Sequence, residues 1–115
     1  MIRSILHLRP APGRTGDLLS YIAEEGIVSR ALALPGCLAA EVATSLPDGR
    51  DVVVSGLWAS MQAYEGWLRS PERLRKGSGM LALLDLQAGE VAAARLYRVD
   101  EITTAAGQSD APVTG

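Results

Sequence analysis

One stretch of the chain decides its fold: DVVVSGLWASMQAYEGWL, residues 51–68. Its three adjacent valines, Val52 to Val54, predict a strand, because β-branched side chains fit the pleated surface of a sheet. Ser60 then predicts the start of a helix, since its hydroxyl can accept a hydrogen bond from the first free backbone N–H groups. Trp58 closes the strand, and Trp67 lies on the helix. Two large aromatic side chains with one N–H donor each indicate a ligand cavity or, as the simpler alternative, a filled core.

Turn and cap signals on both sides of this stretch divide the chain into further strands and helices. The other predicted elements are a strand over 2–9, a helix that Thr15 caps and that runs to about 34, a strand from 37 to about 46, a last helical turn over 80–85 and a strand over 90–102. The helix after Ser60 is expected to restart near Pro71, with Ser70 as its cap. Pro47-Asp48-Gly49-Arg50 predicts a hairpin turn. The order βαββαβ is that of the ferredoxin-like α+β fold with a four-stranded antiparallel sheet. Residues 1–102 form this one domain, and the small, polar stretch 103–115 is expected to be a flexible tail.

The two faces of the first strand predict how the sheet is used. One face carries Ile2, Leu6 and Leu8, and the other carries Arg3, Ile5, His7 and Arg9. Because helices cover only one face of such a sheet, we expect the face of Ile2, Leu6 and Leu8 to be uncovered and to pack against a second copy of the chain. This interpretation predicts a homodimer. It also predicts that His7 points under the helices, where Trp67 is expected.

Composition narrows the class of protein. The 115 residues suffice for one domain, and the formal net charge of −2 gives no electrostatic reason to expect nucleic acid or an anionic membrane as a partner. No apolar run approaches the ~20 residues of a membrane span, and the first residues lack the pattern of a signal peptide, so a cytoplasmic protein is expected. Cys37, the single cysteine, has no metal-binding partner nearby and is expected to be a small apolar residue, so no metal site is predicted.

The chain resembles the antibiotic biosynthesis monooxygenase family of dimeric α+β barrels. The resemblance spans residues 1–102 and rests on the order of elements, the hairpin at 47–50, the Pro35-Gly36-Cys37 turn and the block from Val52 through Leu68. It implies a dimer in which two sheets pack together. The family contains polyketide oxygenases, heme-degrading enzymes and small quinone-modifying proteins, so the shared fold does not fix the reaction.

The polyketide-oxidising members suggest a chemistry without metal, flavin or heme, in which phenols are oxidised to quinones by O2. The deprotonated substrate itself reduces O2, and the protein supplies a dry pocket, a base or donor, and stabilisation of the anion. By resemblance, Trp67 matches the helix tryptophan of these enzymes. The place of its asparagine partner is taken by Ala63, and the chain contains no asparagine. The heme-degrading members carry a ligand histidine where this chain has Gly77, which disfavours heme degradation.

His7 is the candidate base. It is the one histidine of the chain and the side chain expected to titrate near neutral pH unaided. By resemblance to the heme-degrading members, which carry an asparagine at about this place in the first strand, it occupies a pocket position. The alternative is a core histidine with a backbone or tyrosine partner.

Four further residues are candidate substrate contacts: Trp58, Tyr64, Arg69 and Arg95. Tyr64 precedes the helix tryptophan by three residues and shares its face, with ordinary core packing as the alternative. Arg69 begins a basic ridge with Arg73 and Lys76, which could attract a carboxylate or phenolate, or simply face solvent near the helix C-terminus. Arg95 would be an anion partner if it points inward.

The sequence thus predicts a small cofactor-independent monooxygenase that acts with O2 on a polycyclic phenolic substrate, such as an aromatic polyketide intermediate. His7 would serve as base or hydrogen-bond partner, and Trp67 would order the ring and donate its indole N–H. The alternative is a non-catalytic ligand-binding or dimerisation module of the same fold. The missing asparagine favours the module, whereas Trp67 and the placement of His7 favour the enzyme.

Overall fold

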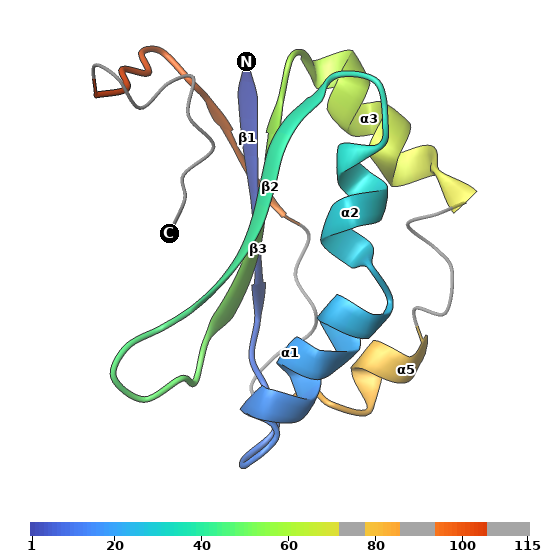
Figure 1. Cartoon of the computed structure of the whole chain (residues 1–115), viewed down its shortest axis with the longest axis vertical. Coiled ribbons are helices and arrows are strands. Elements are labelled where there is room, and N and C mark those ends of the chain that lie inside the picture. Colours follow the sequence, from blue (N-terminus) through green and yellow to red (C-terminus); the bar gives the residue numbers. More distant parts are fainter. Residues whose placement is uncertain (72–77, 86–93, 106–115) are drawn as a thin grey trace.

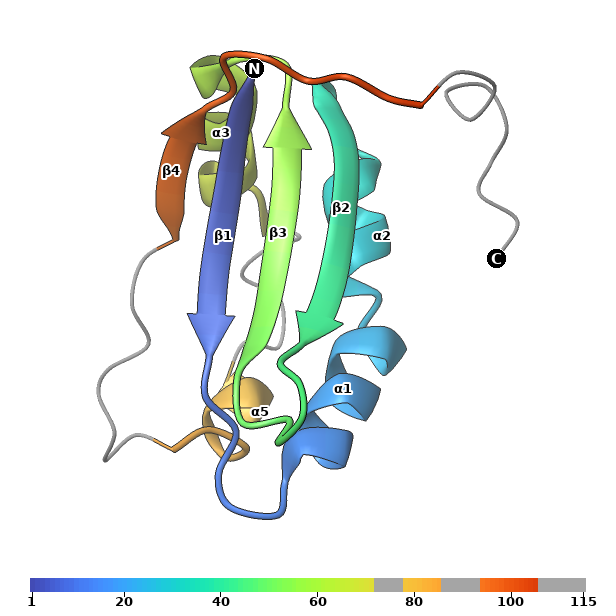
Figure 2. The same ribbon diagram turned by 90° about the vertical axis from the view of Figure 1, so that its left-hand side faces the viewer.

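The computed structural model describes residues 1–71, 78–85 and 94–105. The elements are β1 (Ile2–Leu8), α1 (Thr15–Glu24), α2 (Ile27–Leu32), β2 (Cys37–Thr44), β3 (Val52–Trp58), α3 (Met61–Arg69), α5 (Ser78–Leu81) and β4 (Arg95–Arg98). The four strands form one antiparallel sheet in the order β2-β3-β1-β4. Figure 1 shows the sheet edge-on with the helices on one side, and Figure 2 shows its other side, which no helix covers. The predicted ferredoxin-like α+β fold is confirmed.

The start of α3 forms as its local sequence predicts. Ser60 has an extended backbone, and its Oγ accepts a hydrogen bond from the Ala63 N–H at 3.2 Å. The hydroxyl thereby satisfies one of the N–H groups that a helix start leaves without an intrahelical partner. The helix ends at Arg69, and Ser70 is extended, as the steric bulk of the following Pro71 favours. The helical restart predicted after Pro71 falls largely outside the described residues.

The turn between β2 and β3 is stabilised by a backbone hydrogen bond, by the Asp48 side chain and by a glycine. The Ser45 N–H donates to the Asp51 carbonyl at 2.8 Å. Gly49 has a φ of 67°, a left-handed conformation that glycine adopts without a steric penalty. Asp48 Oδ1 accepts a hydrogen bond from the Arg50 N–H at 3.0 Å, and this bond is the main cause that lowers the pKa of Asp48. The predicted hairpin turn is confirmed.

The first helix differs from its prediction. It is divided into α1 and α2, because Gly26 takes a left-handed conformation with a φ of 63° between them. Thr15 does not cap it: its Oγ1 donates to the Gly49 carbonyl at 2.8 Å, and α1 follows Arg14 without a side-chain cap. A contact with the distant hairpin therefore decides the role of Thr15. The last strand is also shorter than predicted, since β4 covers Arg95–Arg98, and residues 90–93 lie outside the described residues.

The core fills the space between the sheet and the helices, in two clusters near opposite ends of the strands. The first cluster combines buried residues of β1, α1, β3 and the segment after α5: Leu8, Leu18, Ile22, Val52, Leu83 and Leu84. The second combines Ala31 of α2, Trp58 of β3 and Tyr64 of α3. The register places Leu8 opposite Val52 and Ile2 opposite Trp58, so the two clusters are a strand length apart.

The face of β1 that packs against the helices is not the predicted one. Ile2, Leu6 and Leu8 pack against the two core clusters and therefore face the helices. The prediction that they form the uncovered face is wrong. Alternation separates the two faces of a strand, but the helices cover the more apolar one, because burying apolar surface is the larger gain.

The uncovered side of the sheet, which we call the open face, follows from the pairing register. It carries Arg3, Ile5, His7, Ala39, Glu41, Ala43, Val53, Ser55, Leu57, Arg95 and Tyr97. The opposite side is called the covered face.

Candidate functional site

Three aromatic side chains meet on the covered face at the end of β3: Trp58, Tyr64 and Trp67, which we call the aromatic cluster. Trp58 and Trp67 are stacked, with ring centroids 6.4 Å apart and an interplanar angle of 28°. Tyr64 meets Trp58 edge-on, with centroids 5.7 Å apart and an angle of 68°. Both arrangements are ones in which aromatic rings attract each other beyond simple burial. Trp58 and Tyr64 are buried, whereas Trp67 is only partly buried and keeps some surface in contact with solvent.

Trp58 is fixed by a buried hydrogen bond. Its Nε1 donates to Ser4 Oγ at 3.0 Å, and both residues are buried. Leaving either buried group unpaired would cost about 1–3 kcal/mol, so the bond holds the indole in one orientation. Gly56 supplies the room for it, because a Cβ at this position would lie 2.7 Å from Trp58 Nε1. The indole N–H of Trp58 is therefore already used in a hydrogen bond within the protein.

Ser4 is a site residue that the sequence did not reveal. It is a small polar residue between apolar ones on one face of β1. Its meaning depends on the pairing of β1 with β3, which places Ser4 opposite Gly56 and beside Trp58. A single sequence does not give that register.

The Pro35-Gly36-Cys37 turn positions α3 against the sheet. Gly36 has a φ of 84°, and a Cβ on it would lie 2.6 Å from the Cβ of Ala63. The Ala59 N–H donates to the Gly36 carbonyl at 2.7 Å. This close approach requires glycine in the turn. Ala63 stands at the position where the polyketide-oxidising members are expected to carry an asparagine. Its methyl group packs against the Pro35-Gly36-Cys37 turn.

Cys37 packs against the aromatic cluster. Burial raises the pKa of its thiol, which keeps the sulfur protonated at neutral pH. Its Sγ contacts the Ala39 carbonyl at 3.7 Å as a weak donor. Because the thiolate is the nucleophilic and metal-binding form, Cys37 contributes packing, as its sequence context predicts.

His7 lies on the open face, opposite Val53. Its side chain is about half exposed, and its Nδ1 is 3.0 Å from Asp51 Oδ2. The sheet separates this pair from the aromatic cluster. The prediction that His7 points under the helices beside Trp67 is therefore wrong, since the helices cover the face of β1 that carries the leucines.

The two candidate arginines, Arg69 and Arg95, do not lie beside the aromatic cluster. Arg95 is exposed on the open face, opposite Ile5. Arg69 is exposed at the end of α3, and it lies two positions after Trp67, a spacing that does not place two side chains on one helix face. The other predicted positions of this segment lie outside the described residues: Arg73, Lys76 and Gly77.

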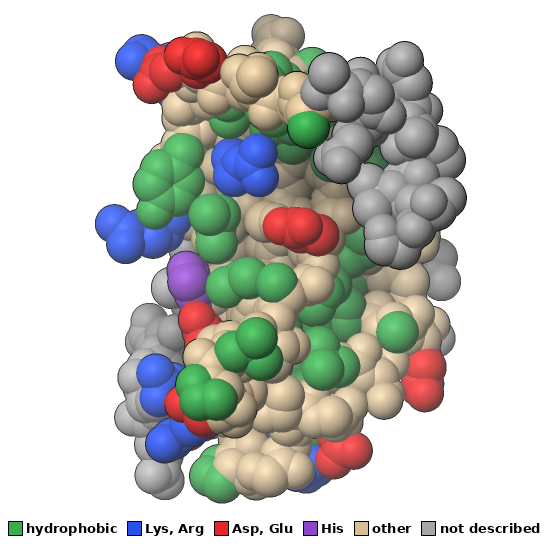
Figure 3. All heavy atoms as spheres, turned by 60° about the vertical axis from the view of Figure 1, so that its left-hand side comes forward, with side chains coloured by type: hydrophobic (Ala, Val, Ile, Leu, Met, Phe, Trp, Pro, Cys, Tyr) green, Lys and Arg blue, Asp and Glu red, His purple; other side chains and the backbone are tan. Residues whose placement is uncertain are grey.

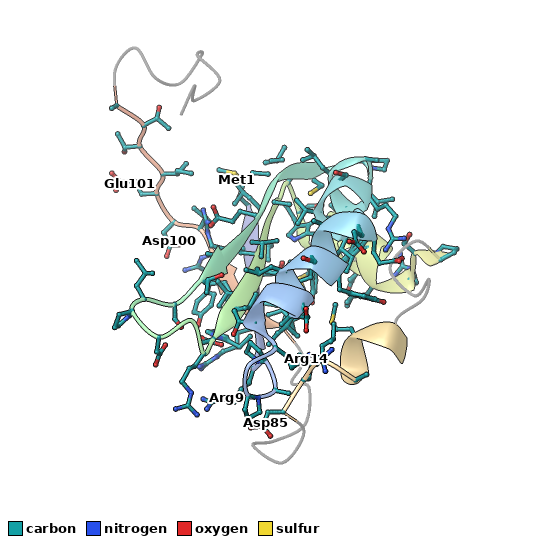
Figure 4. All side chains as sticks on the ribbon, turned by 60° about the horizontal axis from the view of Figure 1, so that its bottom comes forward. Met1, Arg9, Arg14, Asp85, Asp100 and Glu101 are labelled. Carbon is teal, nitrogen blue, oxygen red and sulfur yellow. The ribbon has the colours of Figure 1, made fainter. Side chains whose placement is uncertain are left out.

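A group of charged residues at the other end of the sheet serves the fold. Arg9, Arg14 and Asp85 gather where β1 leads toward α1 (Figure 4). Arg14 Nε pairs with Asp17 at 2.6 Å, and the Asp85 N–H donates to the Arg9 carbonyl at 2.9 Å.

Over residues 1–71, 78–85 and 94–105, no cluster of three or more His, Cys, Asp or Glu side chains could hold a metal ion. In that same part of the chain, no helix is long and apolar enough to cross a membrane.

The sequence profile of the antibiotic biosynthesis monooxygenases matches residues 1–75. This chain belongs to the antibiotic biosynthesis monooxygenase family. The matched stretch runs from β1 through α3 and so contains Ser4 and the whole aromatic cluster. No curated protein matches the chain in sequence.

Solved structures share the fold of this family member. A conserved protein from Methanosarcina mazei Go1 has a TM-score of 0.71 at 15% identity, over 84% of this chain and 90% of that one. SnoaB, a cofactor-independent oxygenase from Streptomyces nogalater, has a TM-score of 0.70 at 14% identity, over 88% and 94%. PA3566 from Pseudomonas aeruginosa has a TM-score of 0.66 at 20% identity, over 89% and 94%. At such identities the likeness shows the fold alone, and an activity has to be argued from this chain's own residues.

Proposed function

We propose that this chain is a cofactor-independent monooxygenase that oxidises a polycyclic phenolic ring with O2. Family membership supports an oxygenase, and SnoaB, a cofactor-independent oxygenase, has the same fold. The observation that carries the proposal is the stack of partly exposed Trp67 on buried Trp58. A planar substrate ring would pack against this rigid aromatic surface, which helps to orient it.

The proposed reaction needs no electron source besides the substrate. Ionisation of the phenol makes the ring electron-rich enough to reduce O2. One oxygen atom enters the ring as a new carbonyl, and the other leaves as water with the phenolic hydrogen and the displaced ring hydrogen. All the electrons that O2 gains come from the ring, which ends as a quinone. The protein holds the ring, excludes water and stabilises the developing negative charge.

The donor assigned to this negative charge is the Trp67 indole N–H. The N–H of Trp58 is already donated to Ser4. Over the described part of the chain, the Trp67 indole has no acceptor of its own. A preorganised donor of this kind is worth about 2.7–4 kcal/mol of transition-state stabilisation, or about 10²–10³ in rate. Tyr64 packs against Trp58 in an edge-to-face arrangement and so helps to keep the stack rigid.

His7 is not the catalytic base in the proposed reaction. Its imidazole and its Asp51 partner lie across the sheet from the aromatic cluster, so a ring stacked on Trp67 has no direct proton path to it. A conjugated polycyclic phenol is itself acidic, and a hydrogen bond from Trp67 to the phenolate further favours the ionised form. The substrate therefore gives its proton to solvent as it binds, without a protein base, and solvent returns a proton to the oxygen atom that leaves as water.

The proposed assembly is a homodimer formed through the open face. This face draws side chains from all four strands, and no helix of the described chain covers it (Figure 2). An exposed apolar patch rimmed by polar residues is typical of an association site. The other partners in the proposal are the small aromatic substrate and O2, with no role for nucleic acid or membrane.

A non-catalytic ligand-binding or dimerisation module is the second candidate. The observation that favours it is the methyl group of Ala63 against Gly36, where polyketide-oxidising members are expected to carry an asparagine. The two candidates differ in one measurable respect. A binding module would hold the phenol without consuming O2.

Oxygen uptake with a panel of polycyclic phenols separates the two candidates. The enzyme should consume O2 in equal amounts to the quinone formed, after exhaustive chelation and without added flavin or heme. Trp67→Phe removes the N–H but keeps most of the ring volume, so kcat should fall by about 10²–10³ while the melting temperature is retained. Leu68→Ala, at the exposed neighbouring position of α3, is the matched control and should keep the wild-type rate. Binding of the phenols without O2 uptake by the wild type would reject the oxygenase in favour of the module.

A further inference from the structure

A buried donor on α2 has no hydrogen-bond partner. The Nε atom of Arg30 is buried, and no acceptor lies within reach of it in the part of the chain that the structure describes. Over the same residues, the Arg30 side chain has no ion pair. A buried polar group without a hydrogen bond costs free energy, and a charged group costs more. Such a group is rare in a folded protein, and an acceptor from outside the chain would account for it.

The surroundings of Arg30 lack carboxylates. The residues one helical turn away on either side are uncharged: Gly26, Ile27, Ala33 and Leu34. The described strands carry no aspartate or glutamate on the covered face. Glu41, the acidic residue of β2, points to the open face, the side that Figure 3 brings forward with acidic side chains among hydrophobic ones. These elements therefore leave the charge of the Arg30 guanidinium without compensation.

Arg30 lies on the side of α2 that is turned toward α3. Its neighbour Ala31 is buried in the core beside the aromatic cluster. Successive helix residues are about 100° apart, so the Arg30 side chain leaves α2 to one side of this buried position. The same offset occurs in α1, where Tyr21 precedes buried Ile22 and its ring would lie 2.8 Å from a Cβ on Gly79 of α5. In Figure 2, α3 lies to the same side of α2 as α5 does of α1, so Arg30 is directed toward α3.

Arg30 and Trp67 lie at similar distances from one contact between their segments. The turn after α2 touches the first turn of α3, where a Cβ on Gly36 would lie 2.6 Å from the Cβ of Ala63. Arg30 precedes Ala33, at the end of α2, by three residues, and Trp67 follows Ala63 by four. At 1.5 Å per residue, both separations are about 4–6 Å along the helix. Figure 1 shows α2 and α3 at the same end of the sheet, so the guanidinium is placed to reach the edge of a ring stacked on Trp67.

The fork geometry of a guanidinium favours a carboxylate as the missing acceptor. The Nε and one Nη of an arginine are parallel donors that match the two oxygens of a carboxylate. Arg30 is partly exposed although its Nε is buried, so the side chain can turn this edge toward a ligand. Such a turn gives the Nε an acceptor and neutralises the charge. A phenolate, with its single oxygen, would use only one of the two donors.

We propose that Arg30 binds a carboxylate of the substrate whose ring stacks on Trp67, so that the substrate is a polycyclic phenol that also carries a carboxylate. The inference rests on the proposed function for the ring, and it adds the acidic group and the residue that holds it. Arg30 acts in binding and orientation, because a second point of attachment fixes how the ring lies on Trp67. The oxidation of the ring is the same with or without it.

Binding in the absence of O2 tests this proposal. Polycyclic hydroxy acids such as 6-hydroxy-2-naphthoate are titrated into the protein under argon by calorimetry, each beside its uncharged methyl ester. The wild type should bind the acid at least about tenfold more tightly than the ester, since the charge-assisted pair forms only with the acid. Arg30→Gln removes the charge and the fork, so its affinities for acid and ester should agree within about twofold. Arg69→Gln removes the same charge from an exposed arginine of α3 and should keep the preference of the wild type.

Each outcome supports or overturns the assignment. A wild type that binds none of the acids more tightly than its ester overturns it, and so does an Arg30→Gln variant that still prefers the acid. An equal loss of preference in Arg69→Gln would show an effect of net charge and also overturns it. Acetate carries the charge without the ring, and competition by acetate as strong as that by the naphthoate would reject an aromatic ligand.

Two further measurements separate this site from a structural role and from the oxygenase. The unliganded Arg30→Gln variant should melt no lower than the wild type, because it removes a buried charge that has no partner. A lower melting temperature with an unchanged preference for the acid would identify Arg30 as a structural residue and overturn the proposal. Because the titrations contain no O2, they stand whether or not the chain is an oxygenase, which oxygen uptake with the preferred acid tests separately.

Discussion

The two faces of the sheet satisfy their polar groups in different ways. On the covered face, the Trp58 N–H donates to Ser4 between two buried residues. On the open face, His7 and Asp51 lie 3.0 Å apart, and both side chains remain substantially exposed. Breaking a buried hydrogen bond costs about 1–3 kcal/mol, whereas an exposed ion pair contributes about 1 kcal/mol or less. The covered face thus has the fixed geometry that catalysis needs, and the open face has the exposed charges that association needs.

The largest effect on stability is expected from Trp58→Ala. Trp58 is 1% exposed and contacts both Tyr64 and Trp67, so truncation should lower the free energy of unfolding by about 3–5 kcal/mol in urea titrations. Tyr97→Ala is the counterpart on the open face. Its ring is 46% exposed, and in the monomeric state its loss should change that free energy by about 0.5 kcal/mol at most. Equal losses at the two positions would remove the distinction between the faces.

A smaller loss is expected from Gly56→Ala. The new Cβ would lie 2.7 Å from Trp58 Nε1, so the indole must shift away from Ser4 at a cost of about 1–3 kcal/mol, with a change in the near-UV circular dichroism of tryptophan. Gly66→Ala is the matched control in α3, where a Cβ meets nothing within 4 Å. It should stabilise the protein by about 0.5–1 kcal/mol, because alanine favours a helix. A Gly56→Ala variant as stable as the wild type would show that Trp58 is not held tightly.

The smallest effect is expected at the exposed hairpin turn. The hydrogen bond from the Arg50 N–H lowers the pKa of Asp48 in the folded state. A carboxyl with a lowered pKa adds stability that is fully present above its unfolded-state pKa, near 3.8, and is lost as the pH falls through the folded-state pKa. The wild type should therefore melt slightly above Asp48→Asn at neutral pH, and the gap should close as the pH falls below 3.8 through the lowered folded-state pKa. A gap that persists in acid would exclude this carboxyl as its cause.

The sequence predicted the features that local chemistry decides. Ser60 caps the N–H of a residue three positions away, and the turn at 47–50 is closed by groups within a few residues of it. The aromatic cluster was also accessible, because its three members lie within ten residues of one another on a strand and the helix that follows. The element order followed from these signals and fixed the fold.

The sequence missed the features that depend on distant contacts. Alternation along β1 sorts its side chains into two sets, but the set that the helices cover is decided by packing, so His7 was assigned to the wrong face. Ser4 was missed because its partner, Trp58, is 54 residues away. Thr15 was expected to cap a helix and instead bonds to Gly49, 34 residues away. In each case the deciding contact joins residues that are distant in the sequence, and a single sequence does not pair them.

The turnover of His7→Ala tests the division of roles between the two faces most directly. The variant is assayed with a phenol that the wild type oxidises, at a protein concentration at which it has the oligomeric state of the wild type. Because the sheet separates His7 from the aromatic cluster, we expect kcat to stay within about twofold of the wild type, in contrast to the large loss expected for Trp67→Phe. A fall of about 10² or more in kcat, with an unchanged melting temperature, would place the catalytic base on the open face and contradict this assignment.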